Sequence, residues 1–268
     1  ELHVRNFETH ITQALQIIDL AAAGMDSALD APPDPAALQR HLLSVLRPTS
    51  FIRSISVVDD NGRIVASSDS ANLGVQLPLD HFYPPTLSDL LRIGLPWRGR
   101  DFHNGEEGPF DDATLGFVPV LRGIPSRSGA MALLVTLHPD FFAHHTRQQL
   151  DEAVGHTQWL RYDGQPLFRT RSLPAALAES LDTAIAMRLQ QTEQGRVTLP
   201  GGQAAPMLSA FRASPQFPVV VATHLDHAQL LAAWREEAQR LALVVLPMLA
   251  TLLLLGVLTL RRQQRVAA

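Results

Sequence analysis

The chain has 268 residues, of which 46% are hydrophobic and 18% charged, so it is long enough for two small domains and too apolar to be disordered. It contains no cysteine and no lysine, which excludes disulfides, cysteine-ligated metals, cysteine nucleophiles and any lysine Schiff base or P-loop. Residues 1–240 hold 26 acidic side chains against 19 arginines, a net charge of −7, and this mildly acidic body argues against nucleic-acid binding.

The first 48 residues are predicted to form two signalling helices. Hydrophobic residues recur at helical spacing from Leu2 to Leu29, which predicts one long amphipathic helix. A proline-rich break at residues 31–35 separates it from a second helix over Ala36–Leu46. Because Glu1 is not an initiator methionine, we expect a first membrane helix upstream, from which the long helix would continue.

Residues 49–152 are predicted to form a first α+β unit. The segment Asp59-Asp60-Asn61-Gly62 is typical of a hairpin turn between two alternating strands. A stretch rich in proline, glycine, aspartate and arginine at residues 78–114 is predicted to be irregular. The expected strands are Ile52–Val58, Arg63–Ser67, Leu73–Val75, Leu115–Leu121 and Ala130–Leu137, followed by a helix over Pro139–Leu150.

Residues 153–225 repeat this pattern in a shorter form and are predicted to form a second unit. Asp163-Gly164 again separates two strands, so the two units form a weak internal repeat of pattern. An exit helix is expected over residues 226–240. The expected strands are Thr157–Tyr162, Pro166–Arg169, Arg196–Leu199, Met207–Ala213 and Val219–His224, with a helix over Leu173–Leu189 between the second and the third.

The run from Leu241 to Leu260 contains 20 residues without a charge. At 1.5 Å per residue it spans about 30 Å, the hydrocarbon thickness of a bilayer, which favours a transmembrane helix over a buried core helix. Arg261, Arg262 and Arg265 follow at once, and the positive-inside rule predicts that residues 261–268 are cytoplasmic. Residues 1–240 are then expected in the periplasm of a bacterium, with an output domain after Ala268.

Three segments carry a resemblance to a known family. Ile55–Gly74 reads ISVVDDNGRIVASSDSANLG, a strand, an Asp-x-x-Gly turn and a strand with serines after it. Gly116–Phe142 reads GFVPVLRGIPSRSGAMALLVTLHPDFF, two strands and the helix that follows, and Ser214–Trp234 reads SPQFPVVVATHLDHAQLLAAW, a last strand and an exit helix. In this order, and ahead of a membrane helix, they resemble double Cache domains, the tandem PAS-like sensors of bacterial transmembrane receptors.

The resemblance implies an α+β fold, with two PAS-like units whose antiparallel sheets stack along the long N-terminal helix, followed by the C-terminal transmembrane helix. Similar modules precede diguanylate cyclases and phosphodiesterases, histidine kinases and chemoreceptors, and this chain looks closest to the first group. We therefore expect a ligand-sensing homodimer in the inner membrane that relays a conformational change to a cytoplasmic output, in cyclic-di-GMP signalling.

The resemblance also implies a ligand site between the distal sheet and the irregular loop at residues 81–112. Aromatic and arginine side chains there suit a small organic ligand with a carboxylate or phosphate, and Asp101 could pair with an amine. The alternative is that Trp97 is a core plug and the charged residues are solvated; a periplasmic partner protein could also take the ligand's place. Amino-acid-binding members carry a cluster of Tyr, Arg, Trp and Asp that cannot be aligned with this chain. The predicted ligand residues are Tyr83, Trp97, Arg98, Arg100, Asp101, His103 and Arg122.

No G-x-S-x-G, H-E-x-x-H, G-x-G-x-x-G or P-loop pattern occurs, so no enzymatic activity and no cofactor are predicted for this chain. His138, Asp140, His144 and His145 have the residue types of a metal site, but a strand-to-helix junction accounts for them more simply, and no metal is predicted. Two alternatives to a sensor remain: a membrane-anchored periplasmic hydrolase, and a dimerisation or partner-binding module that binds no ligand.

Overall fold

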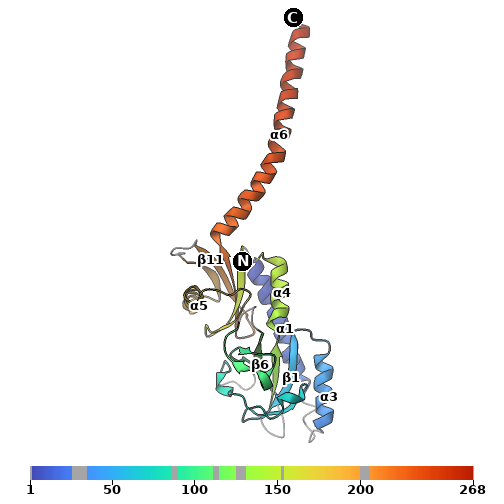
Figure 1. Ribbon diagram of the computed structural model, residues 1–268, viewed down its shortest axis with the longest axis vertical. Helices are drawn as coiled ribbons and strands as arrows, with labels where there is room; N and C mark the ends of the chain where they lie inside the picture. The colour runs from blue at the N-terminus through green and yellow to red at the C-terminus, as the bar shows by residue number, and fades with distance from the viewer. Residues whose placement is uncertain are drawn as a thin grey trace.

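The computed structural model describes residues 2–25, 35–85, 90–110, 115–124, 131–151, 154–199 and 206–267. Two antiparallel sheets lie one beyond the other along helix α1 (Leu2–Ala23), and a long helix, α6 (His227–Ala267), projects from the second sheet (Figure 1). This arrangement confirms the predicted α+β class, with a long N-terminal helix and an apolar C-terminal one.

The distal sheet, which is the one farther from α6, consists of β1 (Ile52–Val58), β2 (Ile64–Ser67), β3 (Leu91–Ile93), β4 (Trp97–Arg98), β5 (Glu106–Glu107), β6 (Gly116–Ile124) and β7 (Met131–Leu137). Its order is β2-β1-β7-β6-β4-β5, with β3 pairing on β6. Asp59 fixes the first turn, because its Oδ1 accepts hydrogen bonds from the backbone N–H groups of Asn61 (3.0 Å) and Arg63 (2.8 Å). Gly62 completes that turn with φ +84°.

The two faces of the distal sheet carry separate cores, because neighbouring residues of a strand point to opposite sides. Val118 and Val120 of β6 lie in the core on the side of α1, to which α3 (Pro35–Leu46) also contributes. Phe117 and Leu121 lie in a second core on the opposite face, beneath the loop predicted at residues 81–112. Each side chain of β6 therefore belongs either to the helix side or to the loop side.

The proximal sheet consists of β8 (Gly155–Arg161), β9 (Pro166–Arg169), β10 (Gln194–Leu199), β11 (Met207–Ala213) and β12 (Val219–Asp226), in the order β10-β11-β12-β8-β9. Helix α5 (Ala175–Leu189) covers one face, where its Ile185 packs with Leu160 and Val220. Trp159 and Val221 belong instead to the core that α1 shares with the distal sheet. A single helix thus packs on both units.

Helix α1 can do this because its buried residues form one stripe. Phe7, Ile11, Leu15 and Ile18 recur every three or four residues, and each is 3% exposed or less. The helix contacts β11 and β12 in the proximal sheet and β6 and β7 in the distal sheet, and it also packs on α4 (Pro139–Gln149). The predicted end of this helix, residues 26–29, lies outside the described residues.

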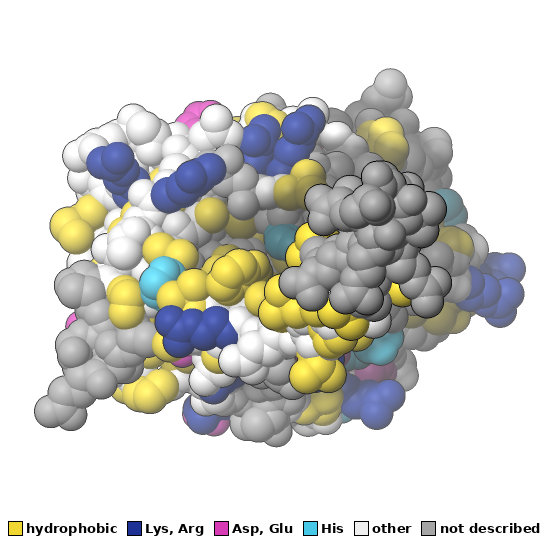
Figure 2. All heavy atoms as spheres, turned by 90° about the horizontal axis from the view of Figure 1, so that it is seen from above, with side chains coloured by type: hydrophobic (Ala, Val, Ile, Leu, Met, Phe, Trp, Pro, Cys, Tyr) yellow, Lys and Arg dark blue, Asp and Glu magenta, His cyan; other side chains and the backbone are white. Residues whose placement is uncertain are grey.

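Strand β12 passes directly into α6. The Asp226 carboxylate caps the junction, since its Oδ1 accepts from the backbone N–H groups of Ala228 (2.9 Å) and Gln229 (3.2 Å). Among the described residues, α6 is the one helix long and apolar enough to cross a membrane, judged by length and composition. Viewed along this helix, hydrophobic side chains surround its base and arginines are spread over the end of the body from which it leaves (Figure 2). From Leu243 to Leu255 the side chains of α6 are exposed; Leu243, for example, is 78% exposed.

Two predicted elements differ from the structure. Leu73–Val75 was expected to be extended, but it forms a turn after a short 3-10 helix at Ser70–Asn72, and Gly74 takes φ +81° there. The stretch at residues 78–114 was expected to be irregular, yet it contains β3, β4 and β5. These strands have only two or three residues each, too few for a visible alternation.

Candidate functional site

Asp101, predicted as a partner for a ligand amine, has a structural role. It is 5% exposed, and its Oδ1 accepts hydrogen bonds from the Ser54 hydroxyl (3.0 Å) and the Phe102 backbone N–H (2.8 Å). Its own backbone N–H donates to the Asn104 side chain, which completes a capping box on the 3-10 helix Phe102–Asn104. The carboxylate therefore anchors the loop to β1.

Trp97 is half-buried and packs against the core under the loop. Its ring stacks on Phe117 with centroids 6.0 Å apart and meets the edge of Phe102 at 5.2 Å. Phe102 in turn packs on Phe117, so three aromatic side chains occupy the loop side of the sheet. This is the alternative raised from the sequence, in which Trp97 is a core plug.

Tyr83 lies where the two units meet. The guanidinium of Arg161, on β8 of the proximal sheet, lies 5.5 Å from the centre of the Tyr83 ring. Arg161 also donates from Nη1 to the backbone carbonyls of His81 (2.7 Å) and Ile93 (3.3 Å) and forms a two-point ion pair with Asp163. Arg161 is 7% exposed, so this buried cation fixes the loop of one unit to the sheet of the other. Sequence reasoning missed it, because nothing local marks a strand arginine as an interface residue.

The other predicted residues do not converge on one cavity. Arg122 faces α1, where its Nε donates to Asp19, and so lies on the opposite side of the sheet from Trp97. His103 donates its backbone N–H to the Asn72 side chain (3.0 Å), and Arg100 is exposed at the surface. Of the seven predicted residues, Arg98 does line a cleft, which is formed by residues that the structure describes.

That cleft, which we call the arginine cleft, lies between the two units and has a volume of about 310 Å³. The distal unit contributes Arg98, whose Nη2 is 3.6 Å from a carboxylate oxygen of Glu106. The proximal unit contributes Arg169, which pairs with Asp182 and donates to Gln158 (2.9 Å). The lining residues are Arg98, Pro109, Phe110, Arg169, Arg171, Ser172 and Leu173. The pair Arg169 and Arg171 went unnoticed in the sequence, although two arginines two residues apart at a strand end are typical of side chains on one face.

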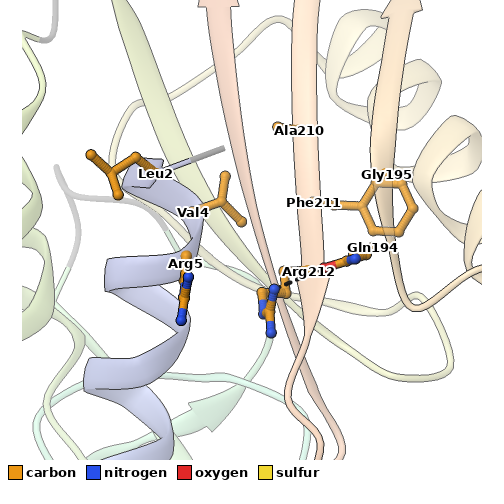
Figure 3. Close-up of a pocket in the computed structure, with 8 residues that line it drawn as sticks. All are labelled: Leu2, Val4, Arg5, Gln194, Gly195, Ala210, Phe211 and Arg212. Atoms are coloured by element: carbon orange, nitrogen blue, oxygen red, sulfur yellow. Dashed lines mark hydrogen bonds between the residues drawn. The ribbon is translucent and has the colours of Figure 1, made fainter.

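A second cleft, of about 430 Å³, lies between the first turns of α1 and strands β10 and β11 (Figure 3). Arg5 projects from the helix wall and Arg212 from the sheet wall. Arg212 is already engaged, since it donates to the Gln194 side chain (2.7 Å) and its Nε lies 3.4 Å from the buried carboxylate of Glu8. The charge of Arg212 is therefore offset by Glu8.

A third cleft, of about 470 Å³, lies between α1, α4 and the segments that precede β1 and α4. Its lining residues are His10, Ser50, His138, Asp140, Phe141, His144, His145 and Gln148. The rings of His10 and His145 lie 4.6 Å apart, and burial followed by the charge of His145 lowers the pKa of His10. Burial, with Arg53 nearby, also lowers the pKa of His138. Over the described residues, no three metal-ligating side chains are placed to share an ion.

The proximal sheet encloses a pair of buried histidines. His156 on β8 and His224 on β12 stack with centroids 4.7 Å apart, and the Ser209 hydroxyl lies 2.7 Å from His224 Nδ1. The Nε2 atoms of both rings are buried without a hydrogen-bond partner. Burial, then Arg171 and Arg169, lowers the pKa of His156 to about 4, and burial also holds the pKa of His224 well below its usual value. Both rings are neutral at neutral pH.

No family model and no curated protein matches this sequence. Solved structures do match in fold. The extracellular domain of the histidine kinase rpHK1S-Z16 aligns with a TM-score of 0.63 at 15% identity, over 86% of this chain and 94% of its own. The ligand-binding domain of the Pseudomonas aeruginosa amino acid chemoreceptor PctB, in complex with L-Arg, gives 0.59 at 11% identity, over 88% of each chain. A domain of a sensory box/GGDEF family protein from Vibrio parahaemolyticus gives 0.51 at 15% identity, over 85% of this chain and 94% of its own.

These three structures are sensory or ligand-binding domains, and each alignment runs over both sheets of this chain rather than one of them. The identities are low, so the likeness concerns the fold. The chain therefore has the fold of the tandem sensor domains that its motifs resemble, the double Cache fold.

Proposed function

We propose that this chain is the extracytoplasmic ligand-sensing module of a signal-transduction receptor, with residues 1–240 in the periplasm and its C-terminus in the cytoplasm. Its fold is that of sensor domains, and α6 has the length and composition of a membrane span. The arginines at residues 261, 262 and 265 favour a cytoplasmic end by the positive-inside rule.

The observation that carries this proposal is the direct junction between β12 and α6. The proximal sheet continues through β12 into the apolar helix with no loop, and Asp226 ties the first turn of the helix to the strand end. A shift or rotation of β12 must therefore move α6. A ligand can drive that motion only through a difference in affinity between two arrangements of the body.

The output that this motion would control is proposed to lie in cyclic-di-GMP signalling. The likeness to the domain of a GGDEF family protein supports that choice, whereas the kinase and chemoreceptor neighbours support only a sensory role. A small organic molecule is the proposed stimulus, since PctB is described as binding L-Arg. The chain itself is proposed to be a sensor without catalytic activity.

A homodimer is proposed because α6 carries an unpartnered apolar stripe. Leu231, Trp234, Leu241 and Val245 are three, seven and four residues apart, which places them on one face of the helix and suits a parallel second copy. They are between 37% and 67% exposed in the single chain. Because the chain has no cysteine, Trp234→Cys should form a disulfide between two copies in membranes, while the neighbouring Arg235→Cys, off the stripe, should form it far more slowly. Equal rates would count against this interface.

The signalling proposal is tested by fusing residues 1–268 ahead of a diguanylate cyclase domain. Cyclic-di-GMP synthesis in membranes is measured against a library of small organic acids, amino acids and purines. A fusion that keeps only α6 is the control and should not respond. Two glycines inserted after Asp226 should abolish any response, because they uncouple the strand from the helix. A library without a single active compound, or a response that survives the glycines, would contradict the proposal.

A further inference from the structure

The geometry points to an anion-binding site in the arginine cleft, for a small doubly charged organic anion, a dicarboxylate or a phosphate monoester, that carries an apolar group. The site lies between the two units, since Arg98 belongs to β4 of the distal sheet and Arg169 ends β9 of the proximal one. This inference rests on the proposed function only where it makes the cleft the site at which the stimulus binds. Binding itself can be measured without any signalling output.

The charges in the cleft favour an anion. Three guanidinium groups line it; Arg169 is paired with Asp182, and Arg98 lies near Glu106. The Glu106 contact is loose, at 3.6 Å, with both side chains more than half exposed, so water and salt weaken it. Behind the cleft, Arg171 and Arg169 contribute, after burial, to the lowered pKa of His156, so their positive field extends into the protein.

The walls of the cleft account for the apolar group. A Cβ on Gly116 would lie 2.1 Å from the Phe110 ring, so the absence of a side chain there lets the ring rest flat on β6. The ring also lies 5.7 Å from that of Phe168, centre to centre, which fixes its far edge. Pro109 and Leu173 extend the apolar side, and a volume of about 310 Å³ suits a ligand of metabolite size.

Gly108 shapes the polar side in the same way. A Cβ there would lie 3.1 Å from Arg98 Nε and 3.3 Å from one of its terminal nitrogens, so the guanidinium rests against bare backbone. The planar fork of Arg98 is thereby held at the mouth of the cleft, where two N–H groups can bind one carboxylate or phosphate in parallel.

A ligand that joins Arg98 to Arg171 would couple the two units. The two residues come from different units, so the anion favours whichever arrangement of the units brings them to its two charged ends. Such a ligand therefore has the differential affinity that a stimulus needs, and its binding should fall as salt rises.

The test measures the melting temperature and the dissociation constant of the full chain in detergent with three probes: inorganic phosphate, succinate and phenyl phosphate. Succinamide and benzyl alcohol serve as uncharged controls. We expect phenyl phosphate to bind most tightly and to raise the melting temperature. Arg98→Gln and Arg171→Gln, both exposed positions, should each weaken its binding between about threefold and tenfold.

Arg100→Gln is the matched control, because Arg100 is exposed on the same loop and does not line the cleft. It should leave the dissociation constant unchanged. The inference is overturned if none of the three probes binds, or if Arg100→Gln weakens binding while the two cleft variants do not. If the anion binds but the cyclase fusion does not respond to it, the site is supported and its signalling role is refuted. If the fusion responds to another compound and no anion binds, the proposed function is supported and the anion site is refuted.

Discussion

Acidification is expected to destabilise the proximal unit, because its core holds two neutral histidines. In the unfolded chain His156 has its ordinary pKa of 6.5, whereas in the folded chain burial lowers that pKa to about 4. At a pH between these two pKa values, His156 is neutral in the folded chain and takes up a proton when the chain unfolds. The stabilisation is therefore complete above pH 6.5 and is lost as the pH falls toward 4.

The size of the effect follows from the gap between the two pKa values. Each pH unit below 6.5 costs about 1.4 kcal/mol, so at a pH near 5 His156 alone should remove about 2 kcal/mol of the free energy of unfolding, and about 3 kcal/mol near pH 4. His224 acts in the same direction, since burial also lowers its pKa. His81 acts oppositely, because its hydrogen bond to Glu107 raises its pKa, but it lies at the surface.

The assay is urea unfolding of the full chain near pH 7.5 and near pH 5, followed by the fluorescence of tryptophan, including the buried Trp159. The quantity compared is the difference between the two pH values, so a variant may be less stable overall and still be informative. The double variant His156→Gln and His224→Gln should lose most of that difference. His144→Gln, at an exposed position on α4, should retain it. A double variant as acid-sensitive as the parent would refute the reasoning.

Three further substitutions test the packing. Leu15→Ala removes a side chain that is 1% exposed on α1 and should cost about 2 to 5 kcal/mol in urea unfolding; a cost below 1 kcal/mol would argue against the shared core. Gly116→Ala pushes on the Phe110 ring and should cost about 1 to 3 kcal/mol while weakening phenyl phosphate binding, and unchanged binding would show that the ring is no wall of the site. Arg122→Gln breaks the ion pair with Asp19 and should cost about 1 kcal/mol or less, and calorimetry should find anion binding intact, since Arg122 lies on the helix side.

The hairpins and helices could be predicted because local chemistry specifies them. Asp59 and Gly62 set a turn that few other residue pairs allow, and the stripe of α1 has one period throughout. The short strands β3, β4 and β5 could not be predicted. They form by pairing with β6 or with one another, so their stability comes from a partner strand and not from their own sequence.

The candidate site was harder, because a sequence does not say which side of a sheet a residue faces. Alternation places Leu121 and Arg122 on opposite sides, but only the structure shows that α1 covers the side of Arg122. Arg98 was predicted as a ligand residue and does line a cleft, but Arg169 and Arg171, which line it too, lie some seventy positions later in the sequence. Contacts of that range follow from how two units dock, which no local pattern records.

The buried guanidinium of Arg161 ties the two units together. It holds the carbonyls of His81 and Ile93 in one unit while its own strand, β8, runs paired with β12, the strand that becomes α6. If the loop backbone moves, either Arg161 loses the two carbonyl acceptors or β8 moves with the loop. The first outcome costs free energy, because it leaves a buried cation without hydrogen-bond acceptors. A displacement of the distal loop backbone is thus passed on as movement of β8 and of its partner β12, which continues into α6.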